Sequence, residues 1–218
     1  MAGVFEAVDD YINSLFVPDD PALAAALVRA DAAGLPPHAV SPGQGKLIYL
    51  LAKMIGAKRV VELGALGGYS TIWLGRALGA GGSLTSIELN PDHAAIARES
   101  IAEAGLSETC EIVEGRALDV LKTLSGPIDV MFLDANKDSY PAYLSQAVRL
   151  VRPGGLILAD NVVREGNVLA PKGVDASAIG AAAFNQALAE HPQLEAIILQ
   201  QVGAKGHDGL AIARVKDS

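Results

Sequence analysis

The stretch RVVELGALGGYSTIWLGRAL, residues 59–78, decides the fold, because it contains the first change of hydrophobic period in the chain. Residues 59–63 are a short, mostly β-branched apolar run, and glycines at 64, 67 and 68 end it. From Tyr69 to Leu78 the apolar residues recur at helical spacing. A strand, a glycine turn and a helix in this order predict the first half of a βαβ unit.

The same alternation continues toward the C-terminus. Further strands are predicted at 83–88, 110–113, 128–133 and 156–159, and helices at 91–104, 118–124, 139–151 and 176–190, the last after a loop from 161 to 175. This order indicates a parallel sheet covered on both faces. The last two strands, 194–200 and 210–215, are too close for a crossover helix and therefore form a hairpin. The predicted fold class is α/β, a Rossmann-like doubly wound seven-stranded sheet, mostly parallel with one antiparallel strand.

Three helical patterns precede this core. Apolar residues recur at helical spacing over 5–16, and an alanine-rich helix covers 22–33. Ser41-Pro42 supplies an N-cap and a first-turn proline for a third helix that ends near Ile55. No linker or repeat divides the chain, so we predict a single domain over 1–218, with N-terminal helices in 1–56 and the α/β core in 57–218.

The composition excludes several classes of function. Lys and Arg number 17 against 25 Asp and Glu, a formal net charge of −8, which argues against the basic surface of a nucleic-acid binder. No apolar run is long enough for a membrane span. The first ten residues lack the positive charge of a signal peptide, and the single cysteine has no partner for a disulfide. We expect a cytoplasmic protein that binds neither nucleic acid nor membranes.

Acidic residues at the ends of the first two strands of the alternating section are candidates for cofactor binding, because parallel sheets bind ligands at that edge. Glu62 would repel a pyrophosphate but can accept a hydrogen bond from the ammonium group of an amino-acid moiety. Glu88 can accept from both hydroxyls of a ribose. The turn after Glu62 reads G-x-x-G-G and differs from the dinucleotide fingerprint. Each feature alone also occurs for structural reasons, but together they favour a nucleoside cofactor.

Oxygen-bearing side chains follow two later strands. Asp134 ends the strand 128–133, and Asp160 and Asn161 end the strand 156–159. If these strands are neighbours, the three side chains converge and suit Mg²⁺ or a similar hard cation, although either Asp alone could be a simple cap. Lys137 follows Asp134 by one helical turn. A nearby cation would disfavour its ammonium form and make it a general base for a substrate hydroxyl, whereas a lone lysine is usually a solvated charge.

Four stretches together resemble the metal-dependent class I O-methyltransferases, the family of the catechol and caffeoyl-CoA O-methyltransferases. They are VELGALGGYS at 61–70, IELNPD at 87–92, DANK at 134–137 and LADNV at 158–162. The resemblance extends from about residue 11 to residue 215 and is strongest to the small bacterial members. It includes SPGQGK at 41–46 and VGAKG at 202–206.

The resemblance implies S-adenosyl-L-methionine as methyl donor and a divalent cation, Mg²⁺ first and Mn²⁺ or Ca²⁺ as alternatives. It implies cofactor-binding roles for Val40, Glu62, Gly64, Ala65, Ser70, Glu88, Ala117 and Asp134. Glu62 would hold the methionine ammonium group, Glu88 the ribose and Ala117 the adenine. Asp134, Asp160 and Asn161 would be the metal ligands, and Lys137, with Asp134, would be catalytic.

The expected reaction is methyl transfer to a vicinal dihydroxy aromatic compound, catechol-like or hydroxycinnamoyl, by a homodimer. Two alternatives stay open at this point. An NAD-dependent oxidoreductase would also use Glu88, but the glycine spacing and the three oxygen ligands argue against it. A non-catalytic nucleoside-binding protein would have little reason to retain Lys137 beside those ligands.

Three features depart from the family pattern. Asn136 stands where plant members usually have Asp, and His207 stands where many bacterial relatives carry Trp. The segment 163–176, which includes Lys172 and is expected near the acceptor, matches no acceptor-specific pattern. These departures leave the identity of the acceptor open.

Overall fold

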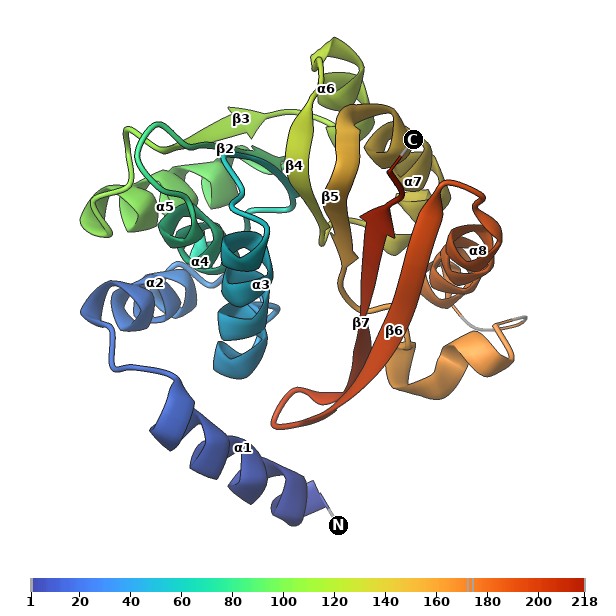
Figure 1. The fold of residues 1–218 in the computed structure, drawn as a ribbon. Helices are drawn as coiled ribbons and strands as arrows, with labels where there is room; N and C mark the ends of the chain where they lie inside the picture. The colour runs from blue at the N-terminus through green and yellow to red at the C-terminus, as the bar shows by residue number, and fades with distance from the viewer. Residues whose placement is uncertain (1, 172, 174, 218) are drawn as a thin grey trace.

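The computed structural model describes residues 2–171, 173 and 175–217, so that Lys172 lies outside the described residues. A seven-stranded sheet with the order β3-β2-β1-β4-β5-β7-β6 forms its centre (Figure 1). The strands are β1 (Arg59–Leu63), β2 (Ser83–Glu88), β3 (Cys110–Glu114), β4 (Ile128–Leu133), β5 (Val151–Ala159), β6 (Leu194–Gly203) and β7 (Gly206–Val215). Among the described strands, β7 alone runs opposite to the other six, which confirms the predicted fold class.

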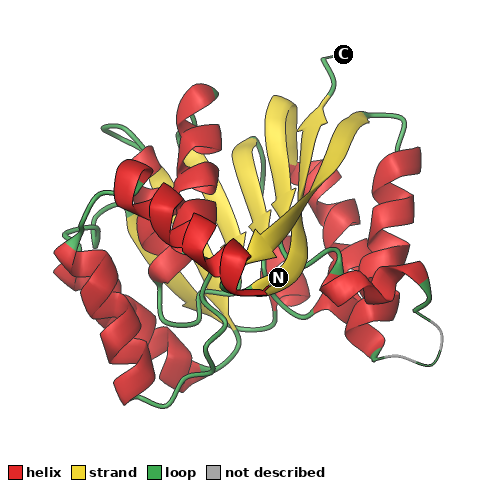
Figure 2. Ribbon diagram, turned by 90° about the horizontal axis from the view of Figure 1, so that it is seen from below, coloured by secondary structure: helices red, strands yellow, loops and turns green. Residues whose placement is uncertain are grey.

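Helices cover both faces of this sheet (Figure 2). They are α1 (Ala2–Phe16), α2 (Pro21–Ala32), α3 (Pro42–Met54), α4 (Tyr69–Ala77), α5 (Pro91–Glu103), α6 (Ala117–Thr123), α7 (Tyr140–Leu150) and α8 (Ala176–Glu190), with short 3-10 helices η1 (Lys137–Ser139) and η2 (Arg164–Leu169). Successive residues of β1 serve opposite faces, as the period of a strand requires. Val60 packs into the core that holds Ile48 of α3 and Leu74 of α4. Val61 packs into the other core with Tyr143 of α7. The described helices include none with the length and hydropathy of a membrane span.

The first turn of α3 is fixed by local chemistry. The Ser41 hydroxyl accepts from the backbone N–H of Gln44 at 3.2 Å, which confirms the predicted N-cap. A Cβ atom at Gly45 would stand only 2.3 Å from Nε1 of Trp73 in α4, so only glycine permits this close helix packing. The N-terminal end of α3 is therefore held against the core of the sheet.

Element bounds differ from expectation mainly in the last third of the chain. β5 begins at Val151 because Gly155 allows a close approach to β4, where a Cβ would meet the Asp129 carbonyl oxygen at 2.8 Å. The final hairpin is longer than predicted, since pairing continues from Leu194 opposite Val215 to Gly203 opposite Gly206. The expected loop after Asn161 contains η2. Each of these three segments contains glycine, a residue that usually marks the end of a strand or helix in a sequence, and here the glycine lies within the element or its turn.

Candidate functional site

A cavity of about 1710 Å³ opens at the carboxyl ends of β1, β2, β4 and β5. This volume exceeds the usual range for a single small ligand and can hold a cofactor together with an acceptor. Ten of the eleven predicted site residues line it, namely Val40, Gly64, Ala65, Ser70, Glu88, Ala117, Asp134, Lys137, Asp160 and Asn161. The fold therefore brings the predicted cofactor and metal residues into one cavity.

Glu62, the eleventh, is fully buried behind the cavity wall at the end of β1. Its Oε2 accepts from the hydroxyls of Thr71 and Ser86, while its Oε1 has no hydrogen-bond partner among the described residues. Burial raises the pKa of Glu62, and the hydroxyls of Ser70, Ser86 and Thr71 oppose that rise. A buried carboxylate oxygen that lacks a donor provides an acceptor for an ammonium group, so the residues fit the amino-acid end of the expected cofactor.

Glu88 is held rigidly at the end of β2. Its two carboxylate oxygens accept from the backbone N–H groups of Leu66 and Asn90, both at 2.9 Å. Leu66 reaches it with a φ of +48°, a conformation that costs free energy for a branched residue. His93 Nδ1 stands 3.9 Å from the carboxylate. These contacts fix an 8% exposed carboxylate on the cavity wall, where it can accept from ribose hydroxyls.

The glycine turn after β1 brings two strand ends together. Gly64 has a φ of +96°, and a Cβ at this position would meet the backbone oxygen of Asp134 at 2.5 Å. Gly68, with a φ of +85°, is the N-cap of α4. It has no side chain that could accept from the first backbone N–H groups of the helix. The turn therefore lets the chain pass close to Asp134 and presents a helix N-terminus beside Ser70, as cofactor binding requires.

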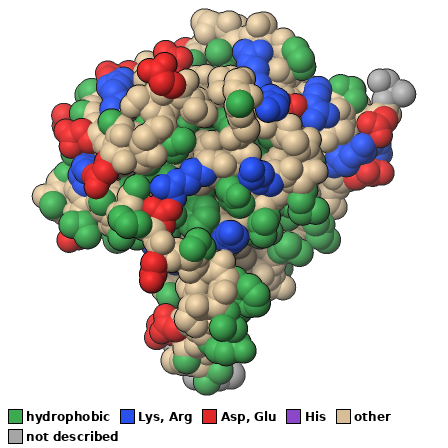
Figure 3. Space-filling view, turned by 60° about the vertical axis from the view of Figure 1, so that its left-hand side comes forward, with side chains coloured by type: hydrophobic (Ala, Val, Ile, Leu, Met, Phe, Trp, Pro, Cys, Tyr) green, Lys and Arg blue, Asp and Glu red, His purple; other side chains and the backbone are tan. Residues whose placement is uncertain are grey.

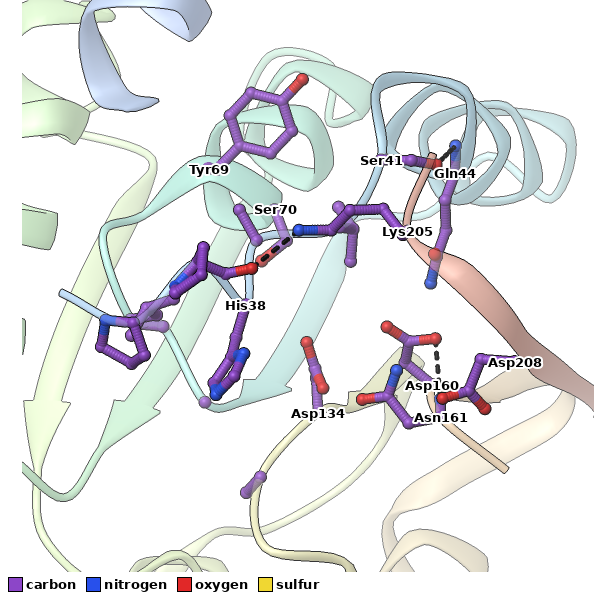
Figure 4. Close-up of a pocket in the computed structure, with 18 of the residues that line it drawn as sticks. His38, Ser41, Gln44, Tyr69, Ser70, Asp134, Asp160, Asn161, Lys205 and Asp208 are labelled. Atoms are coloured by element: carbon purple, nitrogen blue, oxygen red, sulfur yellow. Dashed lines mark hydrogen bonds between the residues drawn. The ribbon is translucent and has the colours of Figure 1, made fainter. Parts of the chain in front are cut away.

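Asp134, Asp160 and Asn161 converge at the ends of β4 and β5, which are adjacent strands (Figure 4). The Asp160 Oδ1 accepts from the backbone N–H of Asn161 at 2.7 Å. Asn161 adopts a φ of +55°, which asparagine tolerates better than most residues and which is typical of functional sites. The two strands β4 and β5 are therefore neighbours, as a shared site of these side chains requires, and the three side chains face one space.

Burial and mutual repulsion dominate the electrostatics of this oxygen cluster. Burial and, after it, repulsion by the Asp134 carboxylate raise the pKa of Asp160 to about 7, and the side-chain amide of Gln44 opposes this rise. Burial also raises the pKa of Asp134, against the effect of the Lys137 ammonium group. Two buried carboxylates and an amide oxygen, with no sulfur or imidazole donor, suit a hard divalent cation, which would relieve the repulsion.

The described part of the chain contains no group of three His, Cys, Asp or Glu side chains placed to bind a metal ion. The candidate set does not depend on such a group, because its third ligand is the amide oxygen of Asn161. Lys137 lies beside the set in η1, with Nζ 2.7 Å from Asp134 Oδ1 and a side chain that is 11% exposed. This contact places an amine where a substrate hydroxyl could lose its proton.

Several residues that support the site could not be identified from the sequence. The Tyr140 hydroxyl lies 2.9 Å from the carbonyl oxygens of Leu133 and Asp160 and bridges the ends of β4 and β5. Asp208 Oδ1 accepts from the backbone N–H groups of Val163 and Arg164 and so holds the chain that follows Asn161. These two residues can be identified only when it is known which strands and helices are neighbours in the fold.

Lys205 reaches over the cavity from the β6–β7 turn. Its Nζ donates to the Pro37 carbonyl at 2.7 Å, close to Ser70 (Figure 4). The same turn is tied to α1, because Asp9 Oδ2 accepts from the backbone N–H of Ala204 at 2.9 Å. These contacts link the hairpin to the N-terminal helices across the cavity mouth.

The three departures from the family pattern have different placements. Asn136 lines the cavity, but its amide is engaged by Tyr143, Asp138 and Ser139. His207 contacts Gln200 across the hairpin at 3.0 Å and does not line the cavity. From the segment 163–176, Arg164 and Glu165 line it. This segment therefore borders the site, as expected.

Comparisons with known proteins agree with this geometry. Residues 17–216 match a family model described as O-methyltransferase. The catechol O-methyltransferase of Mycobacterium tuberculosis is 49% identical over 210 residues, 96% of this chain and 95% of that protein. The catechol O-methyltransferase of Niastella koreensis is 46% identical, covering 98% of each chain. The crystal structure of the O-methyltransferase from Bacillus cereus in complex with SAH superposes with a TM-score of 0.96 at 43% identity, covering 99% of this chain and 100% of that one.

Proposed function

The chain belongs to the O-methyltransferase family, and we propose that it transfers the methyl group of S-adenosylmethionine to one hydroxyl of a vicinal dihydroxy aromatic compound, with a divalent cation. One observation carries this proposal. Asp134, Asp160 and Asn161 share one space with Lys137, beside the glycine turn that follows β1. All four side chains line one cavity, which supports a metal site, a base and a cofactor pocket close together.

The cofactor part of the proposal is supported from two sides. Within the chain, the unpartnered Oε1 of Glu62 provides an acceptor for the methionine ammonium group, and Glu88 provides one for the ribose hydroxyls. Ala117, at the start of α6, lines the cavity where the adenine would lie. Among the relatives, the Bacillus cereus enzyme was solved with SAH, the demethylated form of this donor.

The acceptor part rests on the oxygen cluster. Asp134, Asp160 and Asn161 would hold the cation, and its positive charge would lower the pKa of an acceptor hydroxyl beside it. A compound with two adjacent hydroxyls would offer such a cation two oxygen ligands, and two relatives are named catechol O-methyltransferases. We therefore propose a catechol-like or hydroxycinnamoyl acceptor.

The side chains of the protein position the reactants and move the proton. Lys137 Nζ stands against Asp134 and, as the neutral amine, would take the proton from the acceptor hydroxyl and become an ammonium group. Ser70 and the glycine turn would hold the cofactor in the same cavity, so that the acceptor oxygen could attack its methyl carbon while S-adenosylhomocysteine leaves. Much of the rate enhancement then comes from holding the two reactants together.

The test is methyl transfer from S-adenosylmethionine with Mg²⁺ to a panel of catechols, hydroxycinnamates and their CoA esters. We expect monomethylated products from vicinal diols, and none from phenol or from guaiacol, whose second oxygen already carries a methyl group. Equal turnover of phenol would contradict recognition of a diol. Binding of NAD but not of S-adenosylmethionine in calorimetry would instead support the oxidoreductase, and binding without turnover on any acceptor would support the non-catalytic alternative.

A further inference from the structure

Gln44 is a buried polar residue of α3 that the mechanism above does not use. Its residue is 8% exposed, and it lines the cavity at the first turn of the helix. Its Nε2 is buried and makes no hydrogen bond to any described residue. Burying an amide N–H without an acceptor costs free energy. An unpaired amide in a cavity wall therefore indicates that a bound ligand changes its surroundings.

The side chain of Gln44 is directed at one of the proposed metal ligands. Figure 4 shows it extending from α3 toward the Asp160 carboxylate, with the amide nitrogen as its nearer end. The amide is near enough to act on the charge of Asp160 but does not reach normal hydrogen-bond geometry. The backbone N–H of Asn161 donates to Asp160 Oδ1 at 2.7 Å.

The backbone of Gln44 has little freedom to move away. The next residue, Gly45, packs so closely on Trp73 that a Cβ would stand 2.3 Å from the indole nitrogen. Trp73 is itself 4% exposed and packs edge-on against Tyr49 of α3. The Ser41 cap fixes the same turn from the other side. Gln44 is therefore presented to Asp160 by a rigid part of the core.

We propose that Gln44 is a positioning residue for the metal site: when the cation is bound, its Nε2 donates to the Asp160 carboxylate and sets the orientation in which that carboxylate binds the cation. The inference rests on the proposed function, since it assumes the cation held by Asp134, Asp160 and Asn161. Hydrogen bonds to ligating carboxylates orient them, and their loss typically lowers metal affinity about 10- to 100-fold. Through this hydrogen bond, α3 would be connected to the metal ligand Asp160. Ser41, the N-cap of the same helix, also lines the cavity.

The experiment compares Mn²⁺ binding to the full-length wild type and to Gln44→Met, which keeps the size of the side chain but removes the donor. Titration calorimetry and the electron paramagnetic resonance spectrum of Mn²⁺ provide readouts that do not depend on turnover. We expect Mn²⁺ affinity to fall roughly 10- to 100-fold and the spectrum to change, whereas affinity for S-adenosylmethionine stays within about twofold. The thermal midpoint of the metal-free protein should be unchanged or higher, because a buried unpaired amide is removed.

Two controls separate the possible failures. Leu50→Ala changes an exposed residue of the same helix and should leave Mn²⁺ binding unaltered. If Gln44→Met is unstable, Gln44→Leu provides the same loss of the donor. Equal Mn²⁺ affinity in wild type and folded Gln44 variants would overturn the role of Gln44 alone. A wild type that binds no Mn²⁺ would overturn the proposed metal centre and the role of Gln44 with it.

Discussion

Asp160 is a nearly fully buried carboxyl group with a second carboxylate nearby, an arrangement that suits the proposed cation but lowers the stability of the metal-free protein. Burial raises its pKa to about 7 in the folded protein, whereas an unfolded chain leaves it near 3.8. The folded state therefore holds this proton more tightly than the unfolded state. The stability that this protonation contributes is present below pH 3.8 and is lost as the pH rises through about 7.

Replacing Asp160 with Asn should therefore stabilise the metal-free protein at pH 8 while removing cation binding. We expect a gain of roughly 1–3 kcal/mol, or about 3–10 °C in Tm, and a smaller difference at pH 5. Thermal denaturation in chelator at both pH values measures it. A variant that is less stable than wild type at pH 8 would show that Asp160 has a structural role instead.

Lys137 provides a second test, directed at chemistry. Lys137→Ala should lower turnover by about 10²–10⁴-fold with little change in affinity for S-adenosylmethionine, because the amine acts on the acceptor proton and not on the donor. Steady-state kinetics and calorimetry separate these two effects. The loss should be smallest for nitrocatechols, whose hydroxyl is already acidic. Near-wild-type turnover on an ordinary catechol would mean that Lys137 is a bystander.

The glycine turn between β1 and α4 determines how closely two strand ends approach. Gly64→Ala would place a Cβ 2.5 Å from the backbone oxygen of Asp134 at a φ of +96°. Gly56 has a φ of +63° but open space around it, so Gly56→Ala is a matched control for backbone strain alone.

We expect Gly64→Ala to destabilise by at least about 2–3 kcal/mol and Gly56→Ala by about 1 kcal/mol, as urea denaturation can measure. The first variant should also lose affinity for S-adenosylmethionine, and the second should not. Similar effects of the two substitutions would show that the approach to Asp134 is unimportant.

The elements differ in how far local pattern could predict them. Asp134, Asp160 and Asn161 were predicted because the carboxyl ends of parallel strands meet at one edge, a rule that needs only strand positions. Gln44 and Asp208 could not be predicted in this way. Gln44 depends on how Gly45 packs against Trp73, and Asp208 on the insertion of β7 between β5 and β6. Both are long-range arrangements that no short stretch of sequence specifies.

Helix α1 carries many exposed apolar side chains, and we propose that a second copy of the chain covers them in a homodimer. Figure 3 shows hydrophobic side chains gathered on the projecting part formed by α1. The exposed large apolar residues of α1 are Val4, Phe5, Val8, Tyr11, Ile12, Leu15 and Phe16, and β6, an edge strand, adds Ile197, Leu199 and Val202. An apolar surface of this kind is typical of interfaces.

Light scattering after size exclusion should therefore give twice the chain mass of 22.5 kDa. Joint replacement of Phe5 and Phe16 by Ser should shift the protein toward the monomer, because both side chains lie on the exposed face of α1. A wild type of single-chain mass at micromolar concentration would contradict the homodimer.

The proposed reaction depends on a cation at Asp134, Asp160 and Asn161. The most direct measurement is methyl transfer from S-adenosylmethionine to catechol by chelator-treated protein, before and after metal is returned, with products quantified by mass spectrometry. We expect EDTA to abolish transfer and excess Mg²⁺ or Mn²⁺ to restore it, because all three proposed ligands are hard oxygen donors. Undiminished turnover in the chelated, metal-free protein would contradict this expectation.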